Sequence, residues 1–305
     1  MPTRRQFLAS LPALGAGAYC ARDALAAQAA APVMQLRRIP ALNQAVPVIG
    51  MGTADSFNVG DGEAERAPLR EVLRRFFAGG ATLIDTAPSY GQSETVLGDL
   101  LAELNLRERA FLCTKIGATG RDAGLRQFEQ SLRRLKTGQV ELLQVHNLID
   151  WHEQLALINE LKAQGRVRYS GLTHYHEGGH DALADAVREG RPDFLQINYS
   201  VISTGAEQRL FPMAQELGVA VLVNRAFDDG RLFRQVAGKP LPGWAAAAGI
   251  SSWAQAFLRF ALSHPAVTAV IPATSRPERQ SDNLKAGTGP ALTAQQRSAL
   301  RALFA

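Results

Sequence analysis

The hydrophobic pattern along the chain alternates between short apolar runs and longer segments with helical periodicity, from about residue 45 onward. The apolar runs are continuous and rich in β-branched residues, which is typical of parallel strands buried on both faces. Each run is followed by a segment whose apolar residues fall on one helical face. The pattern predicts eight strand–helix pairs: 46–52 with 63–80, 81–85 with 93–104, 109–117 with 124–136, 139–147 with 152–164, 167–175 with 180–189, 193–200 with 206–218, 219–227 with 251–263, and 267–275 with 276–286.

Eight strand–helix units predict a (β/α)₈ TIM barrel, an α/β fold whose active site lies where the strands give way to helices. A doubly wound sheet is disfavoured, because no G-x-G-x-x-G sequence follows the first strand. Residues 34–45 are expected to form a small hairpin over the barrel bottom, and residues 292–304 a final helix. No linker or second domain interrupts the pattern, so a single domain is predicted.

The N-terminal segment has the order of features of a removable export signal. The pair Arg4 and Arg5 precedes a small, apolar stretch, and A-x-A cleavage sites follow. The apolar part is too short for a membrane span, and the pattern resembles a twin-arginine signal, whose pathway carries folded proteins. The alternative is a disordered basic tail. We therefore expect a signal peptide over 1–29, read by export machinery, and a periplasmic or secreted barrel over 30–305.

Charge and cysteine content narrow the expected partners. The formal net charge of +5 is spread along the chain without a basic run, so nucleic acid is not an expected partner. Cys20 would leave with the signal, and Cys113 would then have no second cysteine to pair with, which suits folding in the cytoplasm before transport. We expect a monomer without stable membrane insertion that acts on a small molecule.

Four polar residues are predicted to meet at one mouth of the barrel. Asp85, Lys115 and His146 stand at the ends of the second, third and fourth strands, and Tyr90 lies in the loop after the second. A lysine beside an aspartate gains a counter-ion, and its ammonium favours the phenolate form of a nearby tyrosine. His146 is placed to orient a substrate carbonyl. Each of these residues, taken alone, would be interpreted as an ordinary buried polar group or a helix cap. The set of four together predicts a catalytic site.

Several motifs resemble the aldo-keto reductase family, over about residues 38–288. DTAPSYGQSETVLG matches the family signature, CTKIG its lysine strand and VELLQVHN its histidine strand. The resemblance implies hydride transfer from NADPH to an aldehyde or ketone, with Tyr90 as proton donor, Lys115 tuned by Asp85, and His146 orienting the carbonyl. It also implies cofactor-binding roles for Gly52, Thr53, Thr173, His174, Gln196, Asn224, Arg225, Ser275, Arg276, Arg279 and Asn283.

The start of the last predicted barrel helix has the features of an anion site. Ser275 and Glu278 are expected to form an S-x-x-E capping box, with Arg276 and Arg279 beside it. An ordinary capped helix with solvated arginines is the alternative reading of this spacing. The resemblance assigns Ser275 and both arginines to the 2′-phosphate of NADP, in preference to NAD, and Asn283 to the adenine.

This sequence differs from the family pattern at two places where the family contacts the nicotinamide. Thr173 and His174 stand where the family usually has Ser-Asn, and Asn224 and Arg225 stand where it usually has an aromatic residue, for which Phe227 is a substitute. These changes leave open a second function class, a non-catalytic barrel that binds or senses NADP.

A third class is a metal-dependent hydrolase, because His174, His176 and His180 form an H-x-H cluster in a predicted loop. Such a site needs further ligands from other strand ends, and a metal-dependent hydrolase would have no use for Asp85, Tyr90 and Lys115. No metal is therefore expected. The substrate pocket is expected to contain the aromatic residues Trp151, Phe227 and Trp244.

Overall fold

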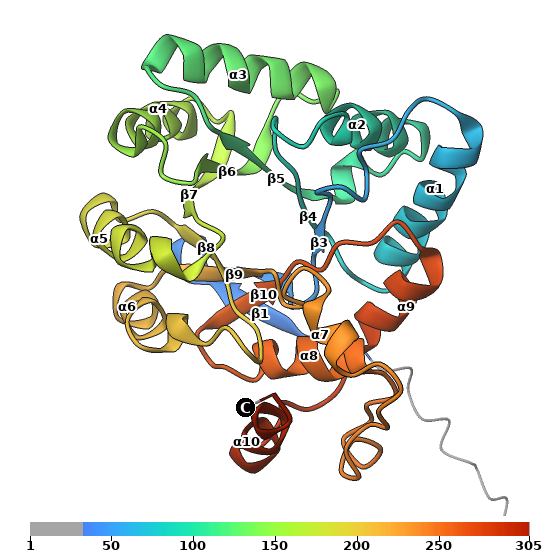
Figure 1. The fold of residues 1–305 in the computed structure, drawn as a ribbon. Coiled ribbons are helices and arrows are strands. Elements are labelled where there is room, and N and C mark those ends of the chain that lie inside the picture. Colours follow the sequence, from blue (N-terminus) through green and yellow to red (C-terminus); the bar gives the residue numbers. More distant parts are fainter. Residues whose placement is uncertain (1–32, 305) are drawn as a thin grey trace, which may run out of the picture. The chain divides into compact units, whose positions relative to one another are not determined.

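The computed structural model describes residues 33–304, and the expected signal at 1–29 lies outside them. Eight parallel strands form one sheet in the order β10-β9-β8-β7-β6-β5-β4-β3. Bridges join its first and last strands through Ile49 with Val270 and Gly52 with Ala273, so the sheet closes on itself. Figure 1 shows these strands ringed by helices, which confirms the (β/α)₈ barrel. The barrel strands are β3 (Met51–Gly52), β4 (Leu83–Asp85), β5 (Phe111–Ile116), β6 (Val140–His146), β7 (Val167–Thr173), β8 (Phe194–Asn198), β9 (Ala220–Asn224) and β10 (Val267–Val270).

Eight helices cover the outer face of the barrel, each following its strand. They are amphipathic: α5, for example, buries Leu183, Ala184 and Val187 and exposes the opposite side. The barrel helices are α1 (Glu63–Ala78), α2 (Ser93–Glu103), α3 (Arg121–Arg134), α4 (Trp151–Ala163), α5 (His180–Gly190), α6 (Leu210–Leu217), α8 (Trp253–Leu262) and α9 (Pro277–Lys285). A short helix α7 (Arg231–Gln235), the final helix α10 (Ala294–Ala302) and the 3₁₀ turns η1 (Pro40–Leu42), η2 (Arg107–Arg109), η3 (Glu177–Gly179) and η4 (Gly205–Glu207) lie outside this repeat.

The predicted hairpin is present at the start of the described chain. Strands β1 (Leu36–Ile39) and β2 (Gln44–Pro47) pair antiparallel. Ile39 and Val46 are buried in a cluster with Leu83, Phe111 and Tyr169 from the barrel strands. This cluster fills the lower part of the barrel with apolar side chains, so the polar strand-end residues can gather only at the opposite end.

The expected capping box at Ser275 and Glu278 is wrong. Helix α9 begins at Pro277, and Arg276 is its N-cap residue, without a side-chain cap. Proline at the first helical position fixes a helical φ and has no N–H to satisfy, so it sets the helix start one residue later than the motif required. Thr274 Oγ accepts a hydrogen bond from the Arg276 N–H at 3.1 Å instead. The predicted final helix is confirmed, and Thr293 with Gln296 forms a capping box at its start.

None of the helices found between residues 33 and 304 has the length and apolar content that a bilayer crossing requires.

Candidate active site

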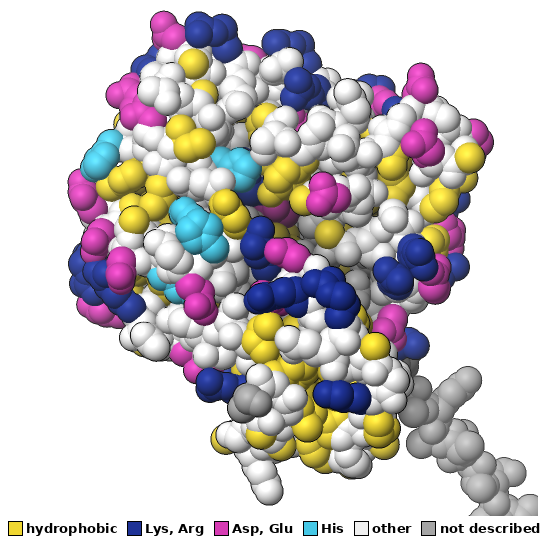
Figure 2. Space-filling view, viewed as in Figure 1, with side chains coloured by type: hydrophobic (Ala, Val, Ile, Leu, Met, Phe, Trp, Pro, Cys, Tyr) yellow, Lys and Arg dark blue, Asp and Glu magenta, His cyan; other side chains and the backbone are white. Residues whose placement is uncertain are grey.

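A cavity of about 640 Å³ opens where the barrel strands end. Figure 2 views this face, with histidine and basic side chains around its middle. Most of the residues singled out from the sequence line the cavity: Gly52, Thr53, Asp85, Tyr90, His146, Thr173, Gln196, Asn224, Arg225 and Arg279. The structure therefore brings these residues from the strand ends together around one cavity.

A buried ion pair lies at the wall of this cavity. Lys115 Nζ donates to Asp85 Oδ2 at 2.7 Å and to the Thr86 carbonyl at 2.8 Å, and the two charged side chains are only 1% and 4% exposed. Burial acts to lower the pKa of Lys115, but attraction to Asp85 outweighs it, so the pKa of Lys115 is raised. Lys115 therefore stays charged at neutral pH.

Tyr90 lies against this charge. The turn after β4 holds it through a hydrogen bond from the Tyr90 N–H to the Ala87 carbonyl at 3.1 Å. Lys115 Nζ lies 5.0 Å from the centroid of its ring. The ring is half-buried and lines the cavity, so the phenol combines a neighbouring cation with access to a substrate.

His146 ends β6 and lies beside the tyrosine. The two rings meet edge to face at 6.0 Å, and Ser89 Oγ lies 3.5 Å from His146 Nδ1. Burial, with the positive charge of Lys115 and with His174 nearby, lowers the pKa of His146 to about 4. The imidazole is therefore neutral at neutral pH and has one N–H, which can donate a hydrogen bond to a carbonyl oxygen.

Two glutamine amides hold the remaining oxygen of the carboxylate. Gln144 Nε2 and Gln196 Nε2 donate to Asp85 Oδ1 at 3.1 and 3.0 Å. Thr173 Oγ1 in turn donates to Gln196 Oε1 at 2.9 Å. Sequence reasoning missed Gln144, although it stands two residues before His146, and residues two apart on a strand share a face.

The rim beside β7 and β9 contains the departures from the family pattern. Asn224 Nδ2 donates to the His174 carbonyl at 3.0 Å, and His174 stacks on Tyr175 with 5.4 Å between ring centroids. The Arg225 guanidinium lies 4.6 Å from the centre of the Tyr175 ring and pairs with Asp229 at 3.0 Å. His174, Tyr175 and Arg225 thus form a short stack of two rings and a guanidinium.

The residues assigned to the adenosine end lie apart from the Tyr90 set. Ser275 and Arg276 are exposed, Asn283 is buried within α9, and only Arg279 of this group lines the cavity. Their contacts with a nucleotide stay predictions.

The aromatic lining differs from the expectation. Phe227 lines the cavity as predicted, together with Tyr175 and Phe233, which sequence reasoning missed. Trp151 and Trp244 pack against the hydrophobic core instead. Phe227 and Phe233 lie between β9 and α8, and Tyr175 follows β7, so the conformations of these two loops decide which rings face the cavity.

The histidines after β7 do not form a metal site. His180 Nε2 lies 3.0 Å from Asn198 Oδ1, and His174 Nδ1 accepts the Tyr175 N–H at 3.0 Å. Across residues 33–304, no group of three or more His, Cys, Asp or Glu side chains is arranged to hold a metal ion. The hydrolase alternative therefore has no geometric support.

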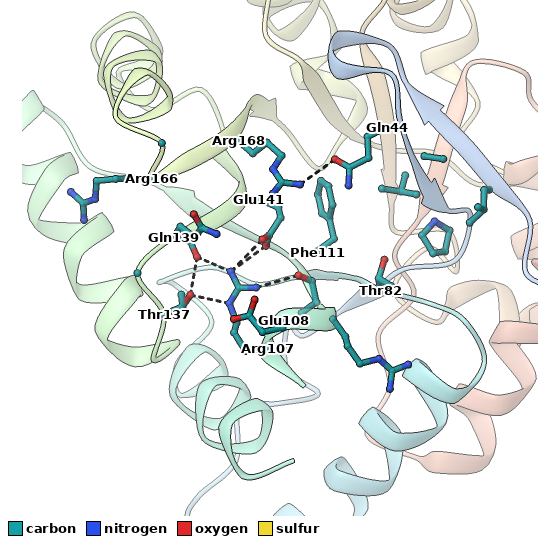
Figure 3. A pocket seen from close by; sticks show the side chains of 18 of the residues that line it. Gln44, Thr82, Arg107, Glu108, Phe111, Thr137, Gln139, Glu141, Arg166 and Arg168 are labelled. Atoms are coloured by element: carbon teal, nitrogen blue, oxygen red, sulfur yellow. Dashed lines mark hydrogen bonds and ion pairs between the residues drawn. The ribbon is translucent and has the colours of Figure 1, made fainter. Parts of the chain in front are cut away.

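A second hollow of about 800 Å³ lies at the other end of the barrel, beside the hairpin (Figure 3). Its arginines contact their own chain: Arg107 donates to Thr137 Oγ1 at 2.9 Å and pairs with Glu141 at 3.3 Å, and Arg168 donates to Gln44 at 3.3 Å. These bonds join the loops at the bottom of the barrel. The residues around the hollow therefore form a network that stabilises the barrel.

Several curated proteins and solved structures are similar to this chain. Methylglyoxal reductase YeaE of Escherichia coli (strain K12) is 30% identical over 233 residues, which cover 74% of this chain and 80% of the relative. A Klebsiella pneumoniae aldo/keto reductase solved with NADP and acetate is 28% identical, with a TM-score of 0.73 over 86% of this chain and 93% of that one. A K. pneumoniae aldo-keto reductase solved with NADPH gives a TM-score of 0.74 at 28% identity, over 89% and 95% of the two chains.

The model of the family described as "Aldo/keto reductase family" matches residues 48–304, which is most of the chain. This match spans all eight barrel strands and the whole Asp85, Tyr90, Lys115 and His146 set. The chain therefore belongs to the aldo/keto reductase family, whose members are NAD(P)-dependent oxidoreductases of carbonyl compounds.

Proposed function

We propose that this chain reduces a small aldehyde or ketone to an alcohol with NADPH, and that Tyr90 supplies the proton. The observation that carries the proposal is the buried Lys115–Asp85 pair, with Nζ 5.0 Å from the Tyr90 ring and the ring of a neutral His146 6.0 Å from that of Tyr90. This is the arrangement that general acid catalysis requires: a phenol whose conjugate base is stabilised by a fixed charge.

The cavity suits a nicotinamide nucleotide. Asn224 Oδ1 is buried and has no hydrogen-bond partner among residues 33–304, so it can accept from a carboxamide N–H. Arg279 is exposed at the edge of the cavity, where a phosphate can meet its guanidinium. When bound, the nucleotide would supply a hydride, which no side chain of the site can provide.

The residues of the chain divide the remaining work. His146 donates a hydrogen bond to the substrate oxygen and fixes the direction of the carbonyl. Tyr90 gives its hydroxyl proton to that oxygen as the carbonyl carbon is reduced, which leaves a phenolate. Lys115 stabilises the phenolate through its charge, and Asp85 holds the ammonium in place.

The relatives support a small carbonyl substrate but differ in cofactor. YeaE is a methylglyoxal reductase, and the K. pneumoniae structures contain NADP or NADPH. Another relative, 25% identical over 219 residues, is an NADH-specific methylglyoxal reductase of E. coli. The preference for the 2′-phosphate therefore rests on this chain's own basic residues at α9.

The parent protein is expected to oxidise NADPH when a small aldehyde is added, and to do so faster than it oxidises NADH. Arg279→Ala should raise the dissociation constant of NADPH by about tenfold to a hundredfold, because a charge-assisted contact contributes about 1.5–3 kcal/mol. NADH affinity should change little. Absorbance at the reduced nicotinamide band and fluorescence titration measure the two effects.

Arg301→Ala serves as the matched control, because Arg301 is an exposed arginine on α10 that does not line the cavity. Equal weakening of NADPH and NADH in the Arg279 variant would rule out a role for Arg279 at the 2′-phosphate. Tight NADPH binding by the parent without oxidation by any carbonyl would replace the reductase proposal with the sensing barrel.

We further propose that the barrel is exported in folded form. The support is the order of features in residues 1–29, where Arg4 and Arg5 precede an apolar stretch. Replacing both arginines with lysine should leave an uncleaved, folded precursor in the cytoplasm, as measured by cell fractionation. Normal cleavage and export of the double variant would contradict the proposal, and nucleotide analysis of the exported parent would tell whether it carries NADP(H) with it.

A further inference from the structure

We propose that Gln144 is a positioning residue of the proton-donating site, acting through Asp85 rather than on the substrate. The inference rests on the proposed reductase function and adds a residue to its machinery. Gln144 lies on β6, is fully buried, and donates from Nε2 to Asp85 Oδ1 at 3.1 Å.

The contacts divide the two oxygens of Asp85 between different partners. Oδ2 accepts from Lys115 at 2.7 Å, whereas Oδ1 accepts from Gln144 and Gln196. A carboxylate can rotate to present either oxygen to an ammonium. With two amides on one oxygen, that rotation is blocked and the other oxygen faces Lys115.

A second observation shows that the fold makes room for this side chain. Gln144 pairs with Gly171 on β7, and a Cβ on Gly171 would lie 2.7 Å from Gln144 Cγ. Gln144 Oε1 has no hydrogen-bond partner among residues 33–304, which is unfavourable for a buried amide. An apolar side chain would fill the barrel without this unpaired acceptor, so packing alone does not account for a glutamine here.

The amide also affects the charge that reaches Tyr90. Donors on Oδ1 spread and stabilise the negative charge of Asp85, so the carboxylate offsets less of the positive charge of Lys115. More of the ammonium field is then available to stabilise the phenolate that forms when Tyr90 gives up its proton. Without Gln144, the reduction step should slow, while nucleotide binding should hardly change.

The test compares Gln144→Met with Gln154→Met. Methionine keeps an unbranched side chain of similar size but has no donor. Gln154 on α4 is a matched control, since it is also fully buried; among residues 33–304 its Oε1 has no partner and its Nε2 donates only to the Gly120 carbonyl, at 3.1 Å. Gln144→Met should lower kcat for aldehyde reduction about tenfold or more, shift the alkaline limb of the kcat–pH profile upward, and leave the Kd of NADPH within about twofold.

Gln154→Met should lower the thermal midpoint without changing the pH profile. Gln144→Glu supplies a second, isosteric variant: its protonated acid still donates to Asp85, whereas its carboxylate repels it. Its kcat should approach the parental value at low pH and fall as the new acid ionises.

The result that overturns the inference is a Gln144→Met enzyme with parental kcat and pH profile, or a Gln144→Glu enzyme whose kcat does not depend on the new acid. The parent is assayed in parallel with NADPH and an aldehyde. If the parent shows no turnover, the reductase function itself fails and the role of Gln144 fails with it. If the parent is active and only the Gln144 results differ from expectation, the failure belongs to Gln144 alone.

Discussion

Tyr90→Phe is expected to slow aldehyde reduction by about 10²- to 10⁴-fold, the contribution of a positioned general acid. Phenylalanine keeps the ring against Lys115 and His146 and removes only the hydroxyl that gives the proton. Because the ring fills the same space, the fold and the affinity for NADPH should stay close to those of the parent. Single-turnover oxidation of bound NADPH by a reactive aldehyde, with a parallel binding titration, measures both quantities.

Tyr169→Phe is the matched control for this variant. The same hydroxyl is removed at the bottom of the barrel, far from the strand ends that form the cavity; within the described part of the chain Tyr169 donates to Gln44 alone, at 2.9 Å. The control should reduce aldehydes at the parental rate. A Tyr90→Phe enzyme as fast as the parent would show that another group, or water, delivers the proton, and the proposed mechanism would have to be abandoned.

The parts of the site that lie at strand ends could be predicted from the sequence. In a parallel barrel all strands end at one mouth, so the ends of apolar runs place Asp85 and His146 together without knowledge of their contacts. Lys115 followed from the same rule, although Ile116 rather than Lys115 is the last residue of β5. Tyr90 could be placed because only a short turn separates it from β4.

Other features depended on information that a periodic pattern does not contain. Gln144 stands within an apolar strand, and only the placement of β6 between β5 and β7 in the closed barrel brings its amide to Asp85 on β4. Tyr175 and Phe233 reach the cavity because of loop conformations, and short-range patterns predict these poorly. The failed capping box at Ser275 shows the opposite case, in which the sequence did contain the signal: Pro277 set the helix start.

The neutral state of His146 also could not be predicted from the sequence, because it depends on the three-dimensional arrangement. Its ordinary pKa of 6.5 falls to about 4 because the ring is buried and lies near the charge of Lys115. The Lys115 ammonium, which we propose stabilises a Tyr90 phenolate, therefore also acts with burial to keep the neighbouring imidazole uncharged. Burial and one neighbouring cation together thus leave His146 as a neutral hydrogen-bond donor beside Tyr90.

Lys115→Met is expected to abolish most of the reduction activity and also to destabilise the fold by about 3–5 kcal/mol. The stability loss follows because Asp85 would remain buried without its counter-ion, and an unpaired buried charge is far less favourable than either the ion pair or a neutral replacement. The activity loss follows separately, because the Tyr90 phenolate loses its stabilising charge. Urea unfolding and single-turnover kinetics at constant pH measure the two losses.

The double variant Lys115→Met with Asp85→Asn separates these two effects. Removing both charges leaves a neutral amide that can still bond to Gln144 and Gln196, so most of the lost stability should return. The activity should not return, because nothing in the double variant stabilises the phenolate. Adding Tyr90→Phe to Lys115→Met should lower the rate little further, since both changes act on one proton transfer. A double variant that regains both stability and activity would contradict the mechanism. It would show that the Lys115–Asp85 pair only stabilises the fold, and that Tyr90 can donate its proton without a neighbouring positive charge.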